Sequence, residues 1–213
     1  MYERQYYFVP KLKYPESLKI KLRKQFNEQN TELAEWRKYG GDDTNSIFVR
    51  PIDRYPNDAV SELEKQINPN VLYPNESFKW AKMKKGCFIP AHMDGRNLSI
   101  IVPVFHEETF TLIYDEKKEY NVHRYDDVPL VNEKGEQSTL ISKGSKWNYG
   151  AVSDCVEIHR WTTDQPFVLN GQWPHGVDAT LSERVIITIS FNDEYDDWDK
   201  IQQLIETGKF WNE

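Results

Sequence analysis

Residues 86–104 read GCFIPAHMDGRNLSIIVPV, and they place His92 and Asp94 one residue apart at the entrance to an apolar, β-branched run. Side chains alternate along an extended segment, so we expect His92 and Asp94 to point to the same face. An imidazole nitrogen beside a carboxylate oxygen supplies two of the three ligands of a facial metal site. Because a His-x-Asp sequence also occurs by chance, this interpretation needs a third ligand from elsewhere in the chain.

The composition is that of a globular protein: 213 residues, of which 38% are hydrophobic, 29% charged and 14% aromatic. This length predicts a single domain over residues 1–213. The formal net charge of −7 argues against broad binding to nucleic-acid backbones, which requires clustered Lys and Arg. The start of the chain has no signal-peptide pattern, and no apolar run approaches the ~18 residues of a membrane helix. We therefore expect a soluble, cytoplasmic protein without membrane contact.

The first third of the chain reads as helical. Apolar residues at helical spacing predict a helix over residues 15–39, which an Asn-rich piece at 27–30 could divide into two. A loop with two prolines follows, and a shorter helix is predicted from residue 57 or 58 to 67. We therefore expect a helical N-terminal part over residues 1–70.

From about residue 71 the pattern changes to short β-type runs separated by Gly, Pro, Asn and Asp. The predicted strands are 78–83, 98–105, 110–114, 120–125, 151–160, 167–170 and 184–191. Many short strands at this spacing predict a mainly β fold with flanking helices, with a β-sandwich or jelly-roll core over residues 71–192. Residues 132–150 read either as a lid over a site or as a plain surface insertion. A helix near 196–207 is predicted within the C-terminal part, residues 193–213.

Of the five histidines, only His175 lies in surroundings that match those of His92. It follows a strand-like run and precedes Arg184, which opens the strongest strand signal in the chain, RVIITISF. The interval of nine positions between His175 and Arg184 is enough for a strand end, a turn and a return antiparallel beside it. This arrangement would place the guanidinium of Arg184 near a metal held by His175.

These residues resemble the signature of the iron(II)- and 2-oxoglutarate-dependent dioxygenases. His92-x-Asp94, a distal His175 and Arg184 nine residues later follow the order of that signature. The segments IPAHMDGR and PHGV are similar to the prolyl and aspartyl/asparaginyl hydroxylase-like branch. The resemblance covers roughly residues 78–192, and it implies a double-stranded β-helix, a cupin-like jelly roll, packed by the N-terminal helices.

The resemblance also implies a chemistry. It implies that His92, Asp94 and His175 are the catalytic ligands of Fe(II), and that Arg184 binds the far carboxylate of the cosubstrate 2-oxoglutarate. The activity would be that of a dioxygenase that hydroxylates a C–H bond of a small-molecule or peptide substrate, with release of succinate and CO2. An amino acid or a peptide side chain is the favoured substrate class. Asp94 favours hydroxylation, since halogenating relatives carry a small residue at this position.

Two alternatives stay open from the sequence. A cupin-type metal-dependent protein that does not use 2-oxoglutarate would fit the spacing of Gly86 and His92, although the usual second His and Glu nearby are missing. Such a protein has no need of a cation at Arg184. A non-catalytic jelly-roll binding protein would retain the same residues for recognition. Taken singly, each of these residues is more often a turn former, a core group or a surface ion-pair partner.

Further side chains are candidates for lining the site, although alternation cannot say which of them point inward. They are Ser99, Tyr114 and Thr188 for hydrogen bonds to the cosubstrate, Arg96 and Asn97 for a carboxylate, and Trp173 for a wall of the site or for the core. Glu157 and His159 form another carboxylate–imidazole pair. We interpret this pair as structural or solvent-facing, because no second histidine follows it at suitable spacing.

Overall fold

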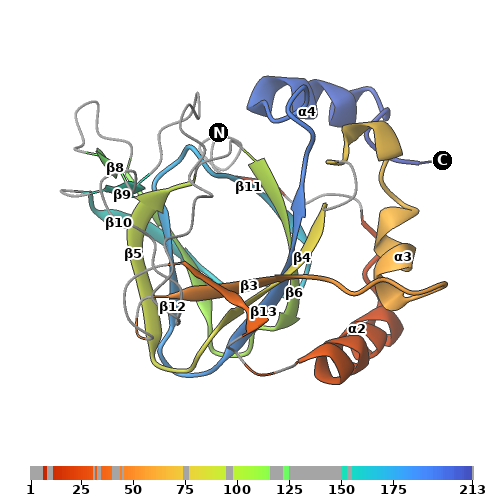
Figure 1. Cartoon of the computed structure of the whole chain (residues 1–213). Coiled ribbons are helices and arrows are strands. Elements are labelled where there is room, and N and C mark those ends of the chain that lie inside the picture. Colours follow the sequence, from red (N-terminus) through yellow and green to blue (C-terminus); the bar gives the residue numbers. More distant parts are fainter. Residues whose placement is uncertain are drawn as a thin grey trace.

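The computed structural model describes residues 7–8, 12–30, 32, 35–39, 44, 46–73, 77–94, 98–115, 122–124, 150–152 and 155–212. In this part of the chain two antiparallel β-sheets face each other, and the helices lie on one side of them (Figure 1). The helices are α2 (Glu16–Gln29), α3 (Ala59–Glu64), the short 3-10 helix η2 (Pro69–Val71) and α4 (Trp198–Glu206).

The strands of the described residues form a seven-stranded and a six-stranded sheet. The first sheet has the order β1 (Tyr7–Phe8), β11 (Phe167–Asn170), β6 (Leu98–Phe105), β13 (Arg184–Ser190), β4 (Phe78–Met83), β3 (Ile47–Pro51) and β2 (Arg37–Tyr39). The second sheet has the order β10 (Glu157–Trp161), β7 (Phe110–Tyr114), β12 (His175–Ala179), β5 (Cys87–Met93), β9 (Gly150–Val152) and β8 (Val122–Arg124).

The order of the core strands identifies the architecture. From β4 through β7 and from β10 through β13, each strand lies in the opposite sheet from the one before it. Between β7 and β10 the chain stays in the second sheet. Strands β8 and β9 lie at one end of that sheet, and β7 and β10 pair with each other. This winding is a double-stranded β-helix, so the predicted fold class, a mainly β jelly roll with flanking helices, is confirmed.

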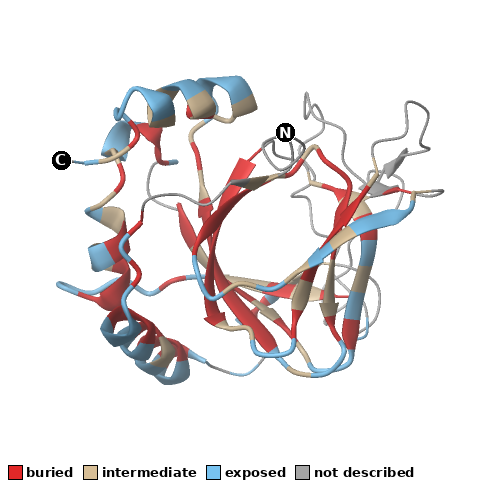
Figure 2. Cartoon of the chain, turned by 180° about the vertical axis from the view of Figure 1, so that it is seen from behind, coloured by how far each residue is buried: buried red, intermediate tan, exposed pale blue. Residues whose placement is uncertain are grey.

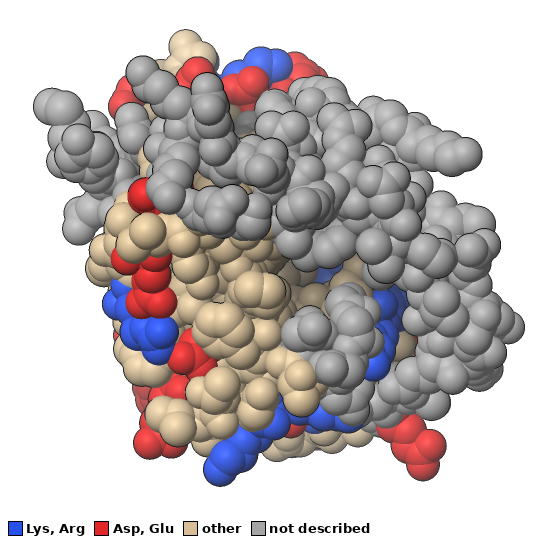
Figure 3. Space-filling view, turned by 90° about the vertical axis from the view of Figure 1, so that its left-hand side faces the viewer, with Lys and Arg blue, Asp and Glu red and all other residues tan. Residues whose placement is uncertain are grey.

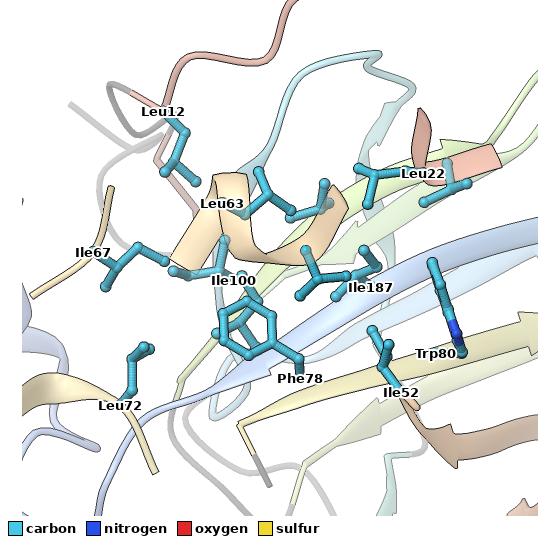
Figure 4. Packing of buried hydrophobic residues seen from close by; sticks show 14 of the residues in the cluster. Leu12, Leu22, Ile52, Leu63, Ile67, Leu72, Phe78, Trp80, Ile100 and Ile187 are labelled. Atoms are coloured by element: carbon cyan, nitrogen blue, oxygen red, sulfur yellow. The ribbon is translucent and has the colours of Figure 1, made fainter. Parts of the chain in front are cut away.

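The main hydrophobic core lies between the first sheet and the helices. Leu22 of α2 and Leu63 of α3 belong to the same buried cluster as Ile100 of β6 and Ile187 of β13 (Figure 4). A second cluster, which includes Ile186, fills the space between the two sheets. Strands β6 and β13 are therefore buried on both faces (Figure 2), which explains why their sequences are continuous apolar runs rather than alternating ones.

The two shorter predicted helices are present, and side-chain caps fix where they begin. Asp58 is 1% exposed and accepts hydrogen bonds from the backbone N–H and the hydroxyl of Ser61, which starts α3. Burial alone would raise the pKa of Asp58, but the hydrogen bonds from Ser61 and Arg54 hold it below its ordinary value. Asp197 caps α4 in the same way.

The N-terminal third is less helical than predicted. Helix α2 ends at Gln29, and Arg37–Tyr39, predicted as helix, form β2. The loop with two prolines that was predicted to follow this helix begins instead with strand β3, which pairs with both β2 and β4. The helical spacing of apolar residues was misleading here because pairing with β3, a contact made in the folded chain, determines the conformation of residues 37–39.

Three predictions about the β region need correction. Cys87–Met93, which are not among the predicted strands, form strand β5. The predicted single strand 151–160 is two strands, β9 and β10, which pair with different partners. Strands β12 and β13 lie in opposite sheets, so Arg184 does not return beside His175 as an antiparallel neighbour. The segment 132–150 lies outside the described residues except for Gly150, and its role as a lid stays a prediction.

Within the described residues, the helices are too short and too polar to cross a lipid bilayer.

Candidate metal centre

The two sequence-predicted histidines and Asp94 come together at one end of the second sheet. Strands β5 and β12 are antiparallel neighbours, and His92 and His175 stand opposite each other in their register. The two imidazole centroids lie 4.3 Å apart. Asp94 follows directly after β5, and one ligand atom from each of the three side chains lies within 4.8 Å of the other two. This grouping is the one that the sequence predicted.

A β-bulge turns His92 toward the interior. On β12, His175 and Val177 are two positions apart, whereas their partners on β5, His92 and Ile89, are three positions apart. The extra residue on β5 reverses the alternation of its side chains. Before the bulge, Cys87 and Ile89 pack between the sheets, whereas Ala91 and Met93 after it pack in a different cluster with Leu112 and Tyr114. Pro90 within the run is the sequence signal for this irregularity.

Hydrogen bonds from the two imidazoles fix which nitrogen faces Asp94. Nδ1 of His92 lies 2.9 Å from the carbonyl oxygen of Pro90, and Nδ1 of His175 lies 2.8 Å from that of Trp173. A carbonyl oxygen only accepts, so in each ring Nδ1 carries a proton and Nε2 is the nitrogen that can offer a lone pair to a metal. Such bonds to a second ring nitrogen are typical of metal-binding histidines.

The donor atoms fit a divalent transition metal. Nε2 of His92 and Nε2 of His175 each lie 3.8 Å from a carboxylate oxygen of Asp94, which is too long for a hydrogen bond. The Nε2 atoms of the two histidines and the carboxylate of Asp94 thus lie around a common point, at a spacing that leaves room for an ion between them. Two imidazoles and one carboxylate are the facial set that non-heme Fe(II) prefers.

Gly176 allows the close approach of β12 to the bulge. A Cβ at this position would lie 2.6 Å from the carbonyl oxygen of Ile89, a backbone atom that cannot move aside alone. We expect Gly176→Ala to lower the free energy of unfolding by about 1–3 kcal/mol, because the two strands must separate. We also expect it to weaken Fe(II) binding by at least about tenfold, because the two histidines lie on these strands. Chemical denaturation and anaerobic titration calorimetry measure the two effects.

Gly208→Ala is the control for that substitution. Gly208 has a φ of +74°, and a Cβ added there would have no neighbour within 4 Å, so alanine strains only the backbone. Gly208 lies just after α4, which packs on the first sheet and contributes no ligand to the candidate metal centre. The substitution should reduce stability and leave Fe(II) affinity unchanged. Equal Fe(II) affinities for Gly176→Ala and the wild type would contradict the role of the strand spacing.

Arg184 lies between the sheets and reaches from one to the other. It is 6% exposed, and it is on the same face of β13 as Ile186, which belongs to the inner cluster. Its Nη1 donates to the carbonyl oxygen of Phe110 at 3.1 Å and its Nη2 to the hydroxyl of Thr111 at 2.9 Å, both on β7. Thr111 is in register with Val177, two residues along β12 from His175 and thus about 7 Å away along the strand.

The charge of Arg184 has only neutral partners among the described residues. Its Nε is buried and makes no hydrogen bond there, and no carboxylate contributes to its electrostatics. Burial lowers the pKa of Arg184 to about 10, so that the guanidinium is still charged at neutral pH. A buried charge without a counter-ion is costly. A carboxylate from a ligand would supply the missing partner.

The remaining sequence candidates divide by the face on which they lie. Ser99 and Thr188 lie on the inner faces of β6 and β13, and the buried hydroxyl of Ser99 has no hydrogen-bond partner within the described chain. Tyr114 points to the other face of β7, where it packs with Leu112. Trp173 packs in the inner cluster. Arg96 and Asn97 lie outside the described residues.

The second carboxylate–imidazole pair has other partners. Glu157 accepts hydrogen bonds from Arg160, and the ring of His159 stacks on that of Tyr7. These contacts and the largely exposed strand agree with the interpretation of the pair as structural or solvent-facing. Two residues near the site, Thr111 and Gln172, were not predicted from the sequence. Thr111 lies between apolar residues on β7, which is only a weak signal of a polar group that faces the site. No local pattern distinguishes Gln172 from an ordinary turn residue.

No protein-family model matches the sequence, and no curated protein matches it. Among solved structures, the chain is similar to a prolyl-4-hydroxylase of Pseudomonas putida, with 13% identity and a TM-score of 0.48 over 89% of this chain and 94% of that chain. It is also similar to SnoN, a non-heme alpha-ketoglutarate-dependent epimerase from nogalamycin biosynthesis, with 12% identity and a TM-score of 0.46 over 88% of this chain and 78% of that one.

A third similar structure is HygX from Streptomyces hygroscopicus, solved with nickel and 2-oxoglutarate bound. It has 12% identity and a TM-score of 0.42, with 88% of this chain and 82% of that chain covered. Likenesses this distant assign no activity to the present chain.

Proposed function

We propose that the protein is an Fe(II)- and 2-oxoglutarate-dependent dioxygenase that hydroxylates a C–H bond of a small-molecule or peptide substrate. The observation that carries this proposal is the pairing of two features inside one barrel. Three ligand atoms from His92, Asp94 and His175 converge at one point. Deeper between the same sheets, Arg184 is a buried cation with neutral partners.

In this proposal the three ligands hold Fe(II) and Arg184 holds the far carboxylate of 2-oxoglutarate. When bound, Fe(II) would accept the 1-carboxylate and keto oxygen of the cosubstrate and activate dioxygen. The distance of about 7 Å along β12 between His175 and the level of Thr111 suits the length of a five-carbon dicarboxylate. Thr111 and the carbonyl of Phe110 direct the guanidinium, which can bind a carboxylate through two parallel hydrogen bonds.

The overall reaction balances with dioxygen as the oxidant. One oxygen atom converts the substrate C–H bond to C–OH, the other enters succinate, and C1 of 2-oxoglutarate leaves as CO2. The apolar side chains of Ile101, Ile113 and Ile186 would exclude water from the space between the ligands and Arg184. A dry site strengthens the attraction between Arg184 and a carboxylate.

Arg184 favours this proposal over a cupin-type protein that does not use 2-oxoglutarate. A cupin that binds only a metal would leave this buried guanidinium without a counter-ion among the described residues, at a cost in stability. A non-catalytic jelly roll would likewise gain nothing from this charge unless it binds an anion.

The described surface supports a substrate smaller than a nucleic acid. On the side of the second sheet, acidic and basic groups of the described residues lie next to one another (Figure 3), and the chain has a formal net charge of −7. Arg160 on β10, for example, is paired with both Glu157 and Asp178. Nucleic-acid binding requires clustered positive charge. We therefore propose an amino acid or a peptide side chain as the substrate class, as the sequence suggests.

The test is substrate-stimulated formation of succinate. Protein loaded with Fe(II) should convert 2-oxoglutarate slowly to succinate under air, and an amino acid, a peptide or a nucleoside from a screen should increase the rate. Stimulation by an amino acid or a peptide would support the proposed substrate class. Protein that binds Fe(II) but neither binds nor consumes 2-oxoglutarate would contradict the proposal and favour the cupin alternative.

A further inference from the structure

The turn between β11 and β12 contacts two of the three candidate ligands. It contains Gly171, Gln172, Trp173 and Pro174. Its shape is set by Asn170, whose carbonyl accepts from the N–H of Trp173 at 3.1 Å and whose side-chain oxygen accepts from the N–H of Gln172 at 3.0 Å. Because Asn170, the residue before the turn, closes it with two hydrogen bonds, the side chains of the turn are held in a defined direction.

Asp94 is fixed by this turn on both sides of its Cα. Its N–H donates to the carbonyl oxygen of Gly171 at 2.8 Å, and its own carbonyl accepts from Nε2 of Gln172 at 2.6 Å. Asp94 needs such support, because it lies one residue beyond the last residue of β5 and the ladder of the sheet does not hold it. The side-chain amide of Gln172 takes the place of a strand neighbour.

The same turn orients His175. The carbonyl of Trp173 accepts the Nδ1 proton of His175, as described above, and the indole N–H of Trp173 donates to the carbonyl of Tyr114 at 2.8 Å. The N–H of Tyr114 donates in turn to the carbonyl of Pro174 at 3.0 Å. The turn is thus joined to β7, and it sets the position of Asp94 relative to His175.

We propose that Gln172 is a positioning residue for the metal centre: it acts through the backbone of Asp94 to hold the carboxylate ligand at the distance from His175 that the metal requires. This inference rests on the proposed function, since it takes His92, Asp94 and His175 as the ligands. Gln172 itself is not a ligand. Outer-shell partners of this kind typically change metal affinity by 10–100-fold when they are removed.

The test measures Fe(II) affinity by anaerobic titration calorimetry on the full chain. Gln172→Met keeps the length of the side chain and removes the donor, and we expect it to raise the dissociation constant for Fe(II) by about 10–100-fold. Gln203→Met makes the same chemical change at an exposed position of α4 and should leave the affinity unchanged. The melting temperatures of the metal-free proteins show whether each variant folds, and Gln172→Ala is the second variant if Gln172→Met does not.

A double-mutant cycle separates positioning from a general structural role. In an Asp94→Ala background the carboxylate is gone, so Gln172→Met should change the remaining Fe(II) affinity by less than about twofold. An equal loss in both backgrounds, or no loss in the wild-type background, would overturn the inference while leaving the proposed function in place. A wild-type protein that binds no Fe(II) would overturn the proposed function, and this inference with it.

Discussion

His175→Ala is expected to weaken Fe(II) binding by more than about 100-fold. The loss of a ligand should exceed the 10–100-fold that removal of an outer-shell partner costs. His92→Ala should have an effect of the same size, because the two imidazoles are equivalent in geometry: each donates through Nδ1 to a carbonyl two residues earlier and presents Nε2 to Asp94. Wild-type protein should bind one Fe(II) per chain in an anaerobic calorimetric titration.

His159→Ala is the matched control for these two variants. His159 lies on β10 and is in register with Ile113, which is also the partner of His175 on the other side of β7. It is therefore at the same level of the sheet, two strands away, and it is not part of the ligand group. Its removal should leave Fe(II) affinity unchanged. Unchanged affinity in both His92→Ala and His175→Ala would rule out the proposed metal centre.

Arg184→Met is expected to weaken 2-oxoglutarate binding by at least about 30-fold while Fe(II) affinity stays at the wild-type value. Truncation of one partner in a buried, hydrogen-bonded charge pair costs about 2–5 kcal/mol, and 1.4 kcal/mol corresponds to tenfold. Arg184→Lys keeps a charge but loses the planar fork, so its affinity should lie between those of Arg184→Met and the wild type. Titration of 2-oxoglutarate into Fe(II)-loaded protein without dioxygen measures both variants.

The stability of ligand-free Arg184→Met provides a second measurement. A buried cation with neutral partners is a liability in the ligand-free protein, and its replacement by an apolar side chain of similar size is often neutral or stabilising by about 1–4 kcal/mol. We therefore expect unfolding by denaturant to require at least as much free energy as for the wild type. Equal 2-oxoglutarate affinities in Arg184→Met and the wild type would exclude the proposed role of this residue.

The lowered pKa of Arg184 also determines how the stability of the fold and the binding of the cosubstrate depend on pH. Because burial lowers the pKa of Arg184 from its ordinary value to about 10, the folded protein binds fewer protons than the unfolded chain only between these two pKa values. Arg184 therefore makes the free energy of unfolding rise with pH only above about pH 10, up to the ordinary pKa of an arginine. Below about pH 10 the guanidinium is charged in both states. Cosubstrate binding through Arg184 should thus not vary between about pH 6.5 and 8.5.

The sequence predicted most of the barrel because its strongest strands are local patterns. The runs at β6 and β13 are continuous, β-branched and apolar, and both were predicted within one residue of their observed ends. The strand β5 was missed because Pro90 interrupts it, and a proline argues against a strand unless a bulge accommodates it. The strand β2 was missed because helical spacing of apolar residues continued up to Trp36, which is buried without being helical.

Residue order alone identifies which side chains could form the site. The spacing of His92 and Asp94, the surroundings of His175 and the position of Arg184 are all readable from it, because they depend on neighbours along the chain. How these residues act together depends on the folded chain. The bulge that turns His92 inward needs Gly176 on the opposite strand, the burial of Arg184 needs the second sheet, and the support of Asp94 needs a turn more than seventy residues away. Contacts between distant parts of the chain set these features, and a local pattern such as Pro90 indicates only that the strand is irregular.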